Sequence, residues 1–132
     1  MTMLKLLAAQ DHQPPAEGDT RTVALPNDAE ALALPLDGVD RVDLHFPSFT
    51  DGRAFSQAFL LRRRRGFAGE IRATGDVLID QLVQMQRTGF SSAVLRAGVD
   101  AADAQRQFER FPGFYQGDAV NPQPLFAARA AA

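Results

Sequence analysis

Three short turns hold the residues whose types and spacing could do chemistry, because each turn combines a glycine with an aspartate. These turns are residues 47–53, 74–76 and 97–100, and their aspartates are Asp51, Asp76 and Asp100. Each turn follows an expected strand and precedes an expected helix, where unpaired backbone N–H groups favour negative charge. Two interpretations stay open: the carboxylates cap the helices, or the turns together form a pocket for a ligand or an anion.

Arginines on the expected strands would suit an anionic ligand at the same edge. Strand alternation places one set of polar side chains opposite the apolar ones: Asp43, His45, Glu70, Arg72, Thr74 and Arg96. Guanidinium groups bind oxyanions through paired hydrogen bonds, so this face could hold an oxyanion. A solvated face or a contact between two copies of the chain would use the same residues.

Two further features also have more than one interpretation. The arginine run at positions 62–65 falls at an expected helix end, where cations complement the helix dipole. It predicts a solvated helix end, with a docking patch for an acidic partner as the alternative. Gln81 lies in the apolar stripe of another expected helix, so we expect it to find a buried hydrogen-bond partner or to face a site.

Composition excludes several classes of chemistry. The chain has no cysteine, which excludes disulfides, thiolate metal sites and thiol nucleophiles. The sequence contains no phosphate-binding loop, dinucleotide fingerprint or histidine pair at metal spacing, and its only histidines are His12 and His45. We therefore predict no metal and no cofactor, and we assign no catalytic residue.

Length, charge and hydropathy describe an ordinary globular chain. Its 132 residues suit one domain, and its content of 45% hydrophobic and 23% charged residues matches globular averages. A net charge of -2 predicts no nucleic-acid partner. The apolar start of the chain is too short to cross a membrane, so we expect a cytoplasmic protein with no membrane partner.

Hydrophobic periodicity predicts the elements that position the three turns. Residues 42–46 alternate between apolar and polar, as in a strand with one buried face. The helix that follows is expected to be capped by Thr50 or Asp51 and to end at Gly66. The residues expected to share one side of this helix are Phe55, Ala58, Phe59 and Arg62.

Two more strand-helix units follow at a regular interval. The second has a strand at residues 70–73 and a helix capped by Asp76, and the third has a strand at residues 93–96 and a helix capped by Asp100. Three Gly-Phe pairs recur at intervals of 23 and 24 residues: Gly66-Phe67, Gly89-Phe90 and Gly113-Phe114. That interval suits one strand plus one helix.

Consecutive units of this kind predict an α/β fold of three to four βα units with a parallel sheet, either partial-barrel-like or open and two-layered. We expect one domain over residues 21–116, between a mobile segment 1–20 and a mobile tail 117–132. Weaker signals predict a strand at 22–25, a short helix at 29–34 and an edge strand at 115–116. So small a sheet leaves open edges, so we expect a homo-oligomer.

An ordered series of motifs lies between about Val42 and Gln116. They are Phe46-Pro47-Ser48-Phe49-Thr50-Asp51-Gly52-Arg53-Ala54-Phe55-Ser56, Leu60-Leu61-Arg62, Gly66-Phe67, Gly69-Glu70-Ile71-Arg72-Ala73, Gly75-Asp76-Val77-Leu78, Asp80-Gln81-Leu82 and Arg87-Thr88-Gly89-Phe90. With these motifs the chain resembles an uncharacterised bacterial family, a domain of unknown function. Members of that family are often described as oxidoreductases involved in sulfite reduction.

The resemblance implies an accessory role in assimilatory sulfate and sulfite reduction, because family members are typically encoded beside sulfite reductase. It implies sulfite reductase or another enzyme of the pathway as partner, or a small anion as ligand, at the strand-to-helix edge. The polar residues that match the family are Asp51, Arg53, Ser56, Arg62, Glu70, Arg72, Asp76, Asp80, Gln81, Arg87, Tyr115 and Gln116. His45 and Arg96 depart from the family pattern.

From the turns and the resemblance together we predict one ligand-binding site. Its residues are Asp51, Arg53, Arg72, Asp76, Asp80 and Gln81. Two other functions stay open. The chain could be an enzyme in its own right that acts on a small oxyanionic substrate, with Asp76 or Asp80 as general base. It could also be a purely structural module that assembles into oligomers.

Overall fold

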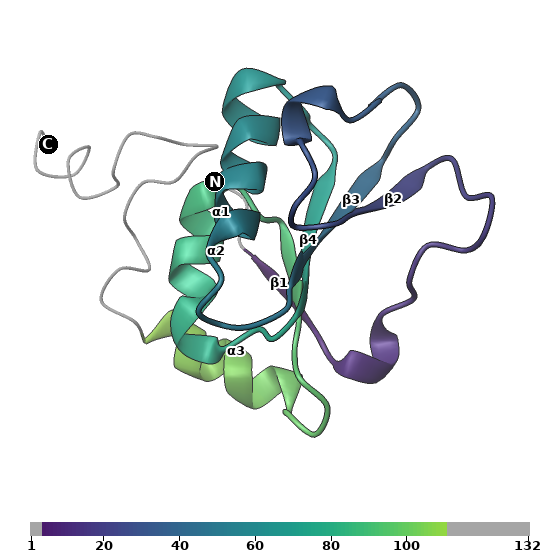
Figure 1. Cartoon of the computed structure of the whole chain (residues 1–132). Helices are drawn as coiled ribbons and strands as arrows, with labels where there is room; N and C mark the ends of the chain where they lie inside the picture. The colour runs from purple at the N-terminus through teal and green to yellow at the C-terminus, as the bar shows by residue number, and fades with distance from the viewer. Residues whose placement is uncertain (1–3, 111–132) are drawn as a thin grey trace, which may run out of the picture.

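A computed structural model describes residues 4–110, which form one parallel β-sheet with three helices against one of its faces (Figure 1). The strands are β1 (Lys5–Leu7), β2 (Thr22–Leu25), β3 (Arg41–Phe46), β4 (Glu70–Gly75) and β5 (Ser92–Val94), and their order in the sheet is β1-β5-β4-β3-β2. The α-helices are α1 (Arg53–Phe59), α2 (Leu82–Thr88) and α3 (Ala101–Glu109). The predicted α/β fold is confirmed, and it takes the open two-layer form.

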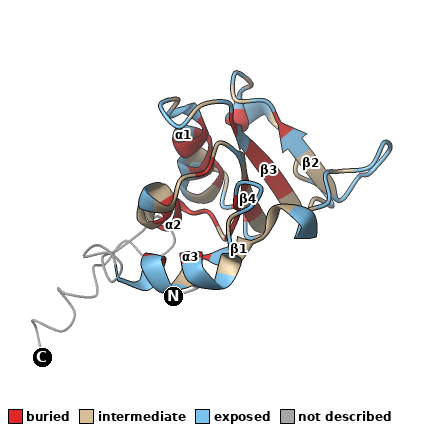
Figure 2. Ribbon diagram, turned by 90° about the horizontal axis from the view of Figure 1, so that it is seen from below, coloured by how far each residue is buried: buried red, intermediate tan, exposed pale blue. Residues whose placement is uncertain are grey.

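The apolar side of the central strands forms the core beneath the helices. Val42, Leu44 and Phe46 of β3 are fully buried, as the alternation predicts. The Phe46 ring packs edge-on against Phe55 of α1, with the ring centroids 5.0 Å apart. Figure 2 shows the buried residues concentrated between the sheet and α1 and α2. This packing fixes the position of the turns between the strands and the helices that follow them.

The sheet contains a strand that the sequence analysis does not predict. β1 pairs with β5, with Leu6 opposite Ala93, and the preceding Leu4 is buried in the core. This strand lies inside the segment 1–20, for which the sequence predicts a mobile segment before the domain. Three residues are too few to show a period of two, so only the long-range pairing with β5 identifies the strand.

The end of α1 widens into one π-helical turn, η3 (Leu60–Arg64). Two of the arginines in or next to this turn, Arg62 and Arg65, point toward the protein. Arg62 donates to the carbonyl oxygens of Phe67, Gly69 and Gly89 at 2.6 to 2.8 Å, and Arg65 donates to those of Ala31 and Leu34. The expected solvated helix end is therefore wrong for these two residues. Their guanidinium groups satisfy loop carbonyls that need a donor.

Phe59 also departs from the prediction, because its side chain is 46% exposed. The buried stripe of this helix is centred on Ala54, Ala58 and Leu61, which are all fully buried. Phe59 lies about 100° around the helix from Ala58, at the border of that stripe. Burial on one side of the helix is therefore narrower than the sequence spacing suggested.

The second helix begins later than predicted. β4 continues to Gly75, the chain makes a tight turn at Asp76, and a 3-10 turn, η4 (Ile79–Gln81), leads into α2. Val77 is buried in the core although it lies before α2. Its apolar side chain therefore fits the helical spacing without belonging to the helix. Gly89 ends α2 with φ 113, in the left-handed conformation expected of a glycine at that point.

The remaining elements follow the weaker signals in part. β2 matches the strand expected at residues 22–25, whereas the short helix expected at 29–34 is a single 3-10 turn, η2 (Ala31–Ala33). One more 3-10 turn, η1 (Ala9–Asp11), follows β1. The edge strand expected at 115–116 and the tail 117–132 lie outside the described residues. Within residues 4–110, every helix is too short or too polar to span a membrane.

Candidate functional site

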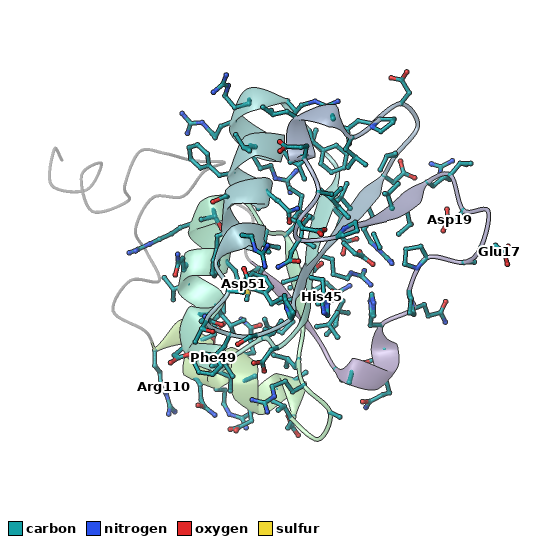
Figure 3. All side chains as sticks on the ribbon, in the orientation of Figure 1. Glu17, Asp19, His45, Phe49, Asp51 and Arg110 are labelled. Atoms are coloured by element: carbon teal, nitrogen blue, oxygen red, sulfur yellow. The ribbon has the colours of Figure 1, made fainter. Side chains whose placement is uncertain are left out.

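The loop between β3 and α1 carries an exposed aromatic ring. Side chains that follow β4 hold the backbone of this loop in place. Phe49 is 50% exposed. Its N–H donates to Asp76 Oδ2 at 2.9 Å, and its carbonyl oxygen accepts from Gln81 Nε2 at 2.8 Å. Both backbone polar groups of Phe49 are thus bound by side chains that follow β4. Figure 3 shows Phe49 and Asp51 on this loop.

Asp51 and Arg53 form a paired contact beside Phe49. Arg53 Nη2 and Nε donate to the Asp51 carboxylate at 2.7 and 3.1 Å, and the Arg53 backbone N–H donates to Asp51 Oδ1 at 3.0 Å. Asn27 Nδ2 adds a fourth donor at 2.8 Å. These hydrogen bonds, led by that from the Arg53 side chain, lower the pKa of Asp51 to about 2. Asp51 therefore binds the first N–H of α1, but the N-cap of the helix is Gly52, so the predicted cap at Thr50 or Asp51 is wrong by one or two positions.

Asp76 does not cap a helix, contrary to the sequence prediction. Its backbone N–H donates to the Phe46 carbonyl oxygen at 2.8 Å, which continues the contact between β4 and β3 beyond Gly75. The carboxylate then points back to the Phe49 N–H, and Arg96 Nε lies 3.6 Å from its other oxygen. The left-handed glycine, with φ 91, makes this change of direction possible.

Asp100 behaves as a simple cap. Its Oδ1 accepts from the N–H of Asp103 at 3.0 Å, at the start of α3. The capping interpretation is therefore confirmed for Asp100. Asp80, in contrast, is exposed on η4 and makes no hydrogen bond or ion pair with any other described residue.

Gln81, expected to find a buried hydrogen-bond partner or to face a site, binds the exposed Phe49 loop. Its Nε2 holds the Phe49 carbonyl, while its buried Oε1 has no hydrogen-bond partner among the described residues. Four of the six predicted site residues, Asp51, Arg53, Asp76 and Gln81, thus lie on or against the Phe49 loop. We call this group, with Phe49, the Phe49 surface.

Arg72 does not join the Phe49 surface. It lies on the sheet face opposite the helices, where its Nη2 is 2.8 Å from Glu70 Oε2 and its Nη1 is 3.0 Å from His12 Nδ1. Ser92 Oγ donates to the same Glu70 oxygen at 2.6 Å. Burial alone would raise the pKa of Glu70, but the hydrogen bonds from Ser92 and Arg72 outweigh burial and lower it. The predicted pairing of Arg53 with Arg72 in one site is not what the structure shows.

The arrangement favours contact with a surface over capture of a small anion. Arg53 is paired with Asp51 and Arg72 with Glu70, so an oxyanion would have to displace a carboxylate at either arginine. Within residues 4–110, no group of three or more metal-ligating side chains comes together. His45 is exposed, with its Nδ1 3.4 Å from Thr74 Oγ1.

Sequence reasoning did not single out Phe49, Asn27 or the contacts of His12. Phe49 sits between two polar residues in a turn rather than in an apolar stripe, and that local signal marks an aromatic ring with no place in the core. Asn27 and His12 reach their partners across 24 and 60 residues of sequence, so no local pattern could identify them.

One comparison with known proteins gives a match. The model of a family described as bacterial protein of unknown function (DUF934) matches residues 22–126. Searches of curated proteins and of solved structures give no match. The match includes every residue of the Phe49 surface, whereas β1 and His12 precede it.

Proposed function

We propose that this chain, which belongs to the DUF934 family of bacterial proteins of unknown function, is an accessory protein of assimilatory sulfite reduction that docks on an enzyme of that pathway. The pathway comes from the family resemblance of the motifs between Val42 and Gln116. The docking comes from the Phe49 surface. Sulfite reductase is the partner to test first.

The clamped loop is the observation that carries the proposal. An aromatic side chain that is half exposed costs little to order on binding when its backbone is already held at both N–H and C=O. Interfaces draw most of their affinity from a few such anchors, and arginines commonly flank them. Arg53 and Arg96 each lie next to a carboxylate of the Phe49 surface, Asp51 and Asp76 respectively.

The direct test is binding of purified sulfite reductase from the same organism to wild-type protein and to Phe49→Ala. Loss of a central anchor costs at least about 2 kcal/mol, so we expect the dissociation constant to rise by at least about 30-fold. Phe59→Ala is the matched control, because Phe59 is exposed to a similar extent, 46% against 50%, but lies on the outer side of α1. We expect this control to bind as the wild type does.

Two results would contradict the proposal. Equal binding by wild type and Phe49→Ala would exclude the Phe49 surface, and an absence of binding by the wild-type chain would exclude sulfite reductase as the partner. A second variant, Asp76→Ala, keeps the ring but removes the acceptor of the Phe49 N–H. We expect it to weaken binding less than Phe49→Ala does, because the ring itself remains.

Two further expectations belong to this proposal. A cytoplasmic location would place the chain with its partner, and association of copies through the outer edges of β1 and β2 would cover the ends of the sheet. Light scattering at micromolar concentration tests the second, since a monomer would argue against it.

A further inference from the structure

The chain between β1 and β2 crosses the sheet on the face opposite the helices. β1 and β2 lie at the two outer edges of the sheet, so the connection must span all the strands between them. Figure 1 shows it on the side of the sheet away from α1, α2 and α3. We call residues 8–21 the crossing segment. Its residues beyond Gln13 are almost all exposed.

Two neighbouring residues attach the crossing segment to the middle of the sheet. The Gln13 carbonyl oxygen accepts from Arg41 Nη2 at 2.8 Å. The His12 ring lies between β3 and β4, with Nδ1 3.0 Å from Arg72 Nη1 and Nε2 3.9 Å from Asp43 Oδ2. At the far end the segment is held by an exposed ion pair between Arg21 and Asp40.

The contact with Arg72 requires a neutral imidazole. A guanidinium group can only donate hydrogen bonds, so His12 Nδ1 must be the acceptor. The ring proton then sits on Nε2, which faces the Asp43 carboxylate. Protonation of Nδ1 would place two positively charged donors 3.0 Å apart, and the contact between His12 and Arg72 would be lost.

Burial and the surrounding charges together disfavour protonation of His12. Burial is the largest cause and lowers the pKa of His12 from its ordinary value of 6.5. Asp43 raises it, Arg72 and Arg41 lower it, and Glu70 raises it slightly. These four residues are the charged groups of β3 and β4 that face the ring, and Asp43 is almost completely buried.

We propose that His12 is a pH-dependent switch that holds the crossing segment on the open face of the sheet while neutral and releases it when protonated. Release would uncover the faces of β3, β4 and β5 that carry Arg41, Asp43, Glu70, Arg72 and Ser92. The device is independent of the Phe49 surface, because it uses the other face of the sheet.

The sign of the effect follows from the direction of the shift. A histidine whose pKa is lower in the attached state stabilises attachment above the pKa of the free residue, near 6.5, and this contribution is lost as the pH falls through the lower, attached-state value. One proton is taken up on release. The ratio of released to attached molecules can therefore rise by at most about tenfold per pH unit in this window.

Hydrogen exchange of the full chain tests the switch. The N–H groups of Asp11 and His12 donate to Ala8 and Ala9 within the segment, and their protection reports its attachment. After correction for the intrinsic pH dependence of exchange, we expect protection at these two amides to fall several-fold between pH 7.5 and pH 5.5. The amide of Leu44 in β3 should stay protected and show that the sheet remains folded.

Two variants separate the switch from general acid effects. His12→Gln keeps a neutral acceptor for Arg72 and a donor for Asp43 but cannot titrate in this range, so its segment should stay protected at pH 5.5. His45→Gln removes the only other histidine, which is exposed, and should behave as the wild type. The same loss of protection in His12→Gln and wild type would overturn the proposal.

A second measurement covers the case in which His12→Gln does not fold. Titration of the His12 imidazole of the wild-type chain by NMR should give a midpoint below the ordinary value of 6.5. The backbone amide shifts of residues 11–13 should follow the His12 midpoint. Amide shifts that do not change through the His12 titration would exclude release of the segment by protonation.

Discussion

The two faces of the same strands differ in what covers them. On one face Val42, Leu44 and Phe46 of β3 are buried by the helices and make no polar contact through their side chains. On the other face, the intervening positions Arg41 and Asp43 form an ion pair beneath the crossing segment. Adjacent residues of one strand thus sit in an apolar core and in a network of charges.

The difference shows how each face contributes. Apolar burial is non-directional and supplies most of the free energy of folding, so the helix-covered face determines stability. Hydrogen bonds and ion pairs are directional and contribute less on balance, but they depend on register, which here places Asp43 beside Arg72. The contacts of the charged face therefore fix the position of the crossing segment. Protonation of His12, as proposed above, would break its contact with Arg72.

The largest effect should come from the helix-covered face. Phe46→Ala removes a fully buried ring that packs against Phe55 and leaves a cavity, so we expect the free energy of unfolding to fall by about 3–5 kcal/mol. Urea denaturation measures this loss. Phe49→Ala is the control and should change stability by less than about 0.5 kcal/mol. Similar losses in the two variants would contradict the assignment of the core.

Removal of the Arg62 side chain, in η3, should lower stability nearly as much. Arg62→Met removes the donor for three carbonyl oxygens, and each carbonyl left without a partner costs about 1 kcal/mol, so we expect a loss of about 3 kcal/mol. Arg64→Met removes an exposed arginine from the same turn and should have almost no effect. Thermal unfolding of the two variants side by side makes the comparison.

Replacing both partners of the ion pair between Arg41 and Asp43 should lower stability less than removing one of them. Asp43→Leu leaves Arg41 without its carboxylate, and we expect a loss of about 2 kcal/mol. The double variant Arg41→Met with Asp43→Leu should recover more than half of this loss, because an apolar pair needs no partner. Urea denaturation of the set checks both values. A double variant no more stable than the single one would mean that the ion pair itself holds the sheet.

The smallest effect concerns the pair beside the Phe49 loop, which belongs to neither face. The low pKa of Asp51 means that its contribution to stability is present above pH 3.8, the ordinary value, and is lost as the pH falls through about 2. NMR titration of the Asp51 carboxyl group should give a midpoint near 2. Arg53→Ala should bring the midpoint back toward 3.8, and an unchanged midpoint would exclude Arg53 as the main cause.

The comparison also explains which predictions from sequence were correct. The apolar positions of β3 and β4, the cap at Asp100 and the left-handed Gly66 after η3 depend on residues within a few positions of one another. Asp51 likewise binds a backbone N–H two residues away. The role of Asp76 was predicted wrongly, because its partner is Phe49, 27 residues earlier.

The sequence by itself determined the order of the three central strand-helix units, β3 to α3, and the side of each central strand that is apolar, because periodicity and capping are local properties. Only the tertiary structure decided that Lys5–Leu7 pairs with β5, that Arg62 turns inward to bind carbonyls, and that Arg72 faces His12 while Asp76 and Gln81 hold Phe49. These contacts join residues that are distant in sequence, and the register of the parallel sheet together with the packing of the helices brings them together.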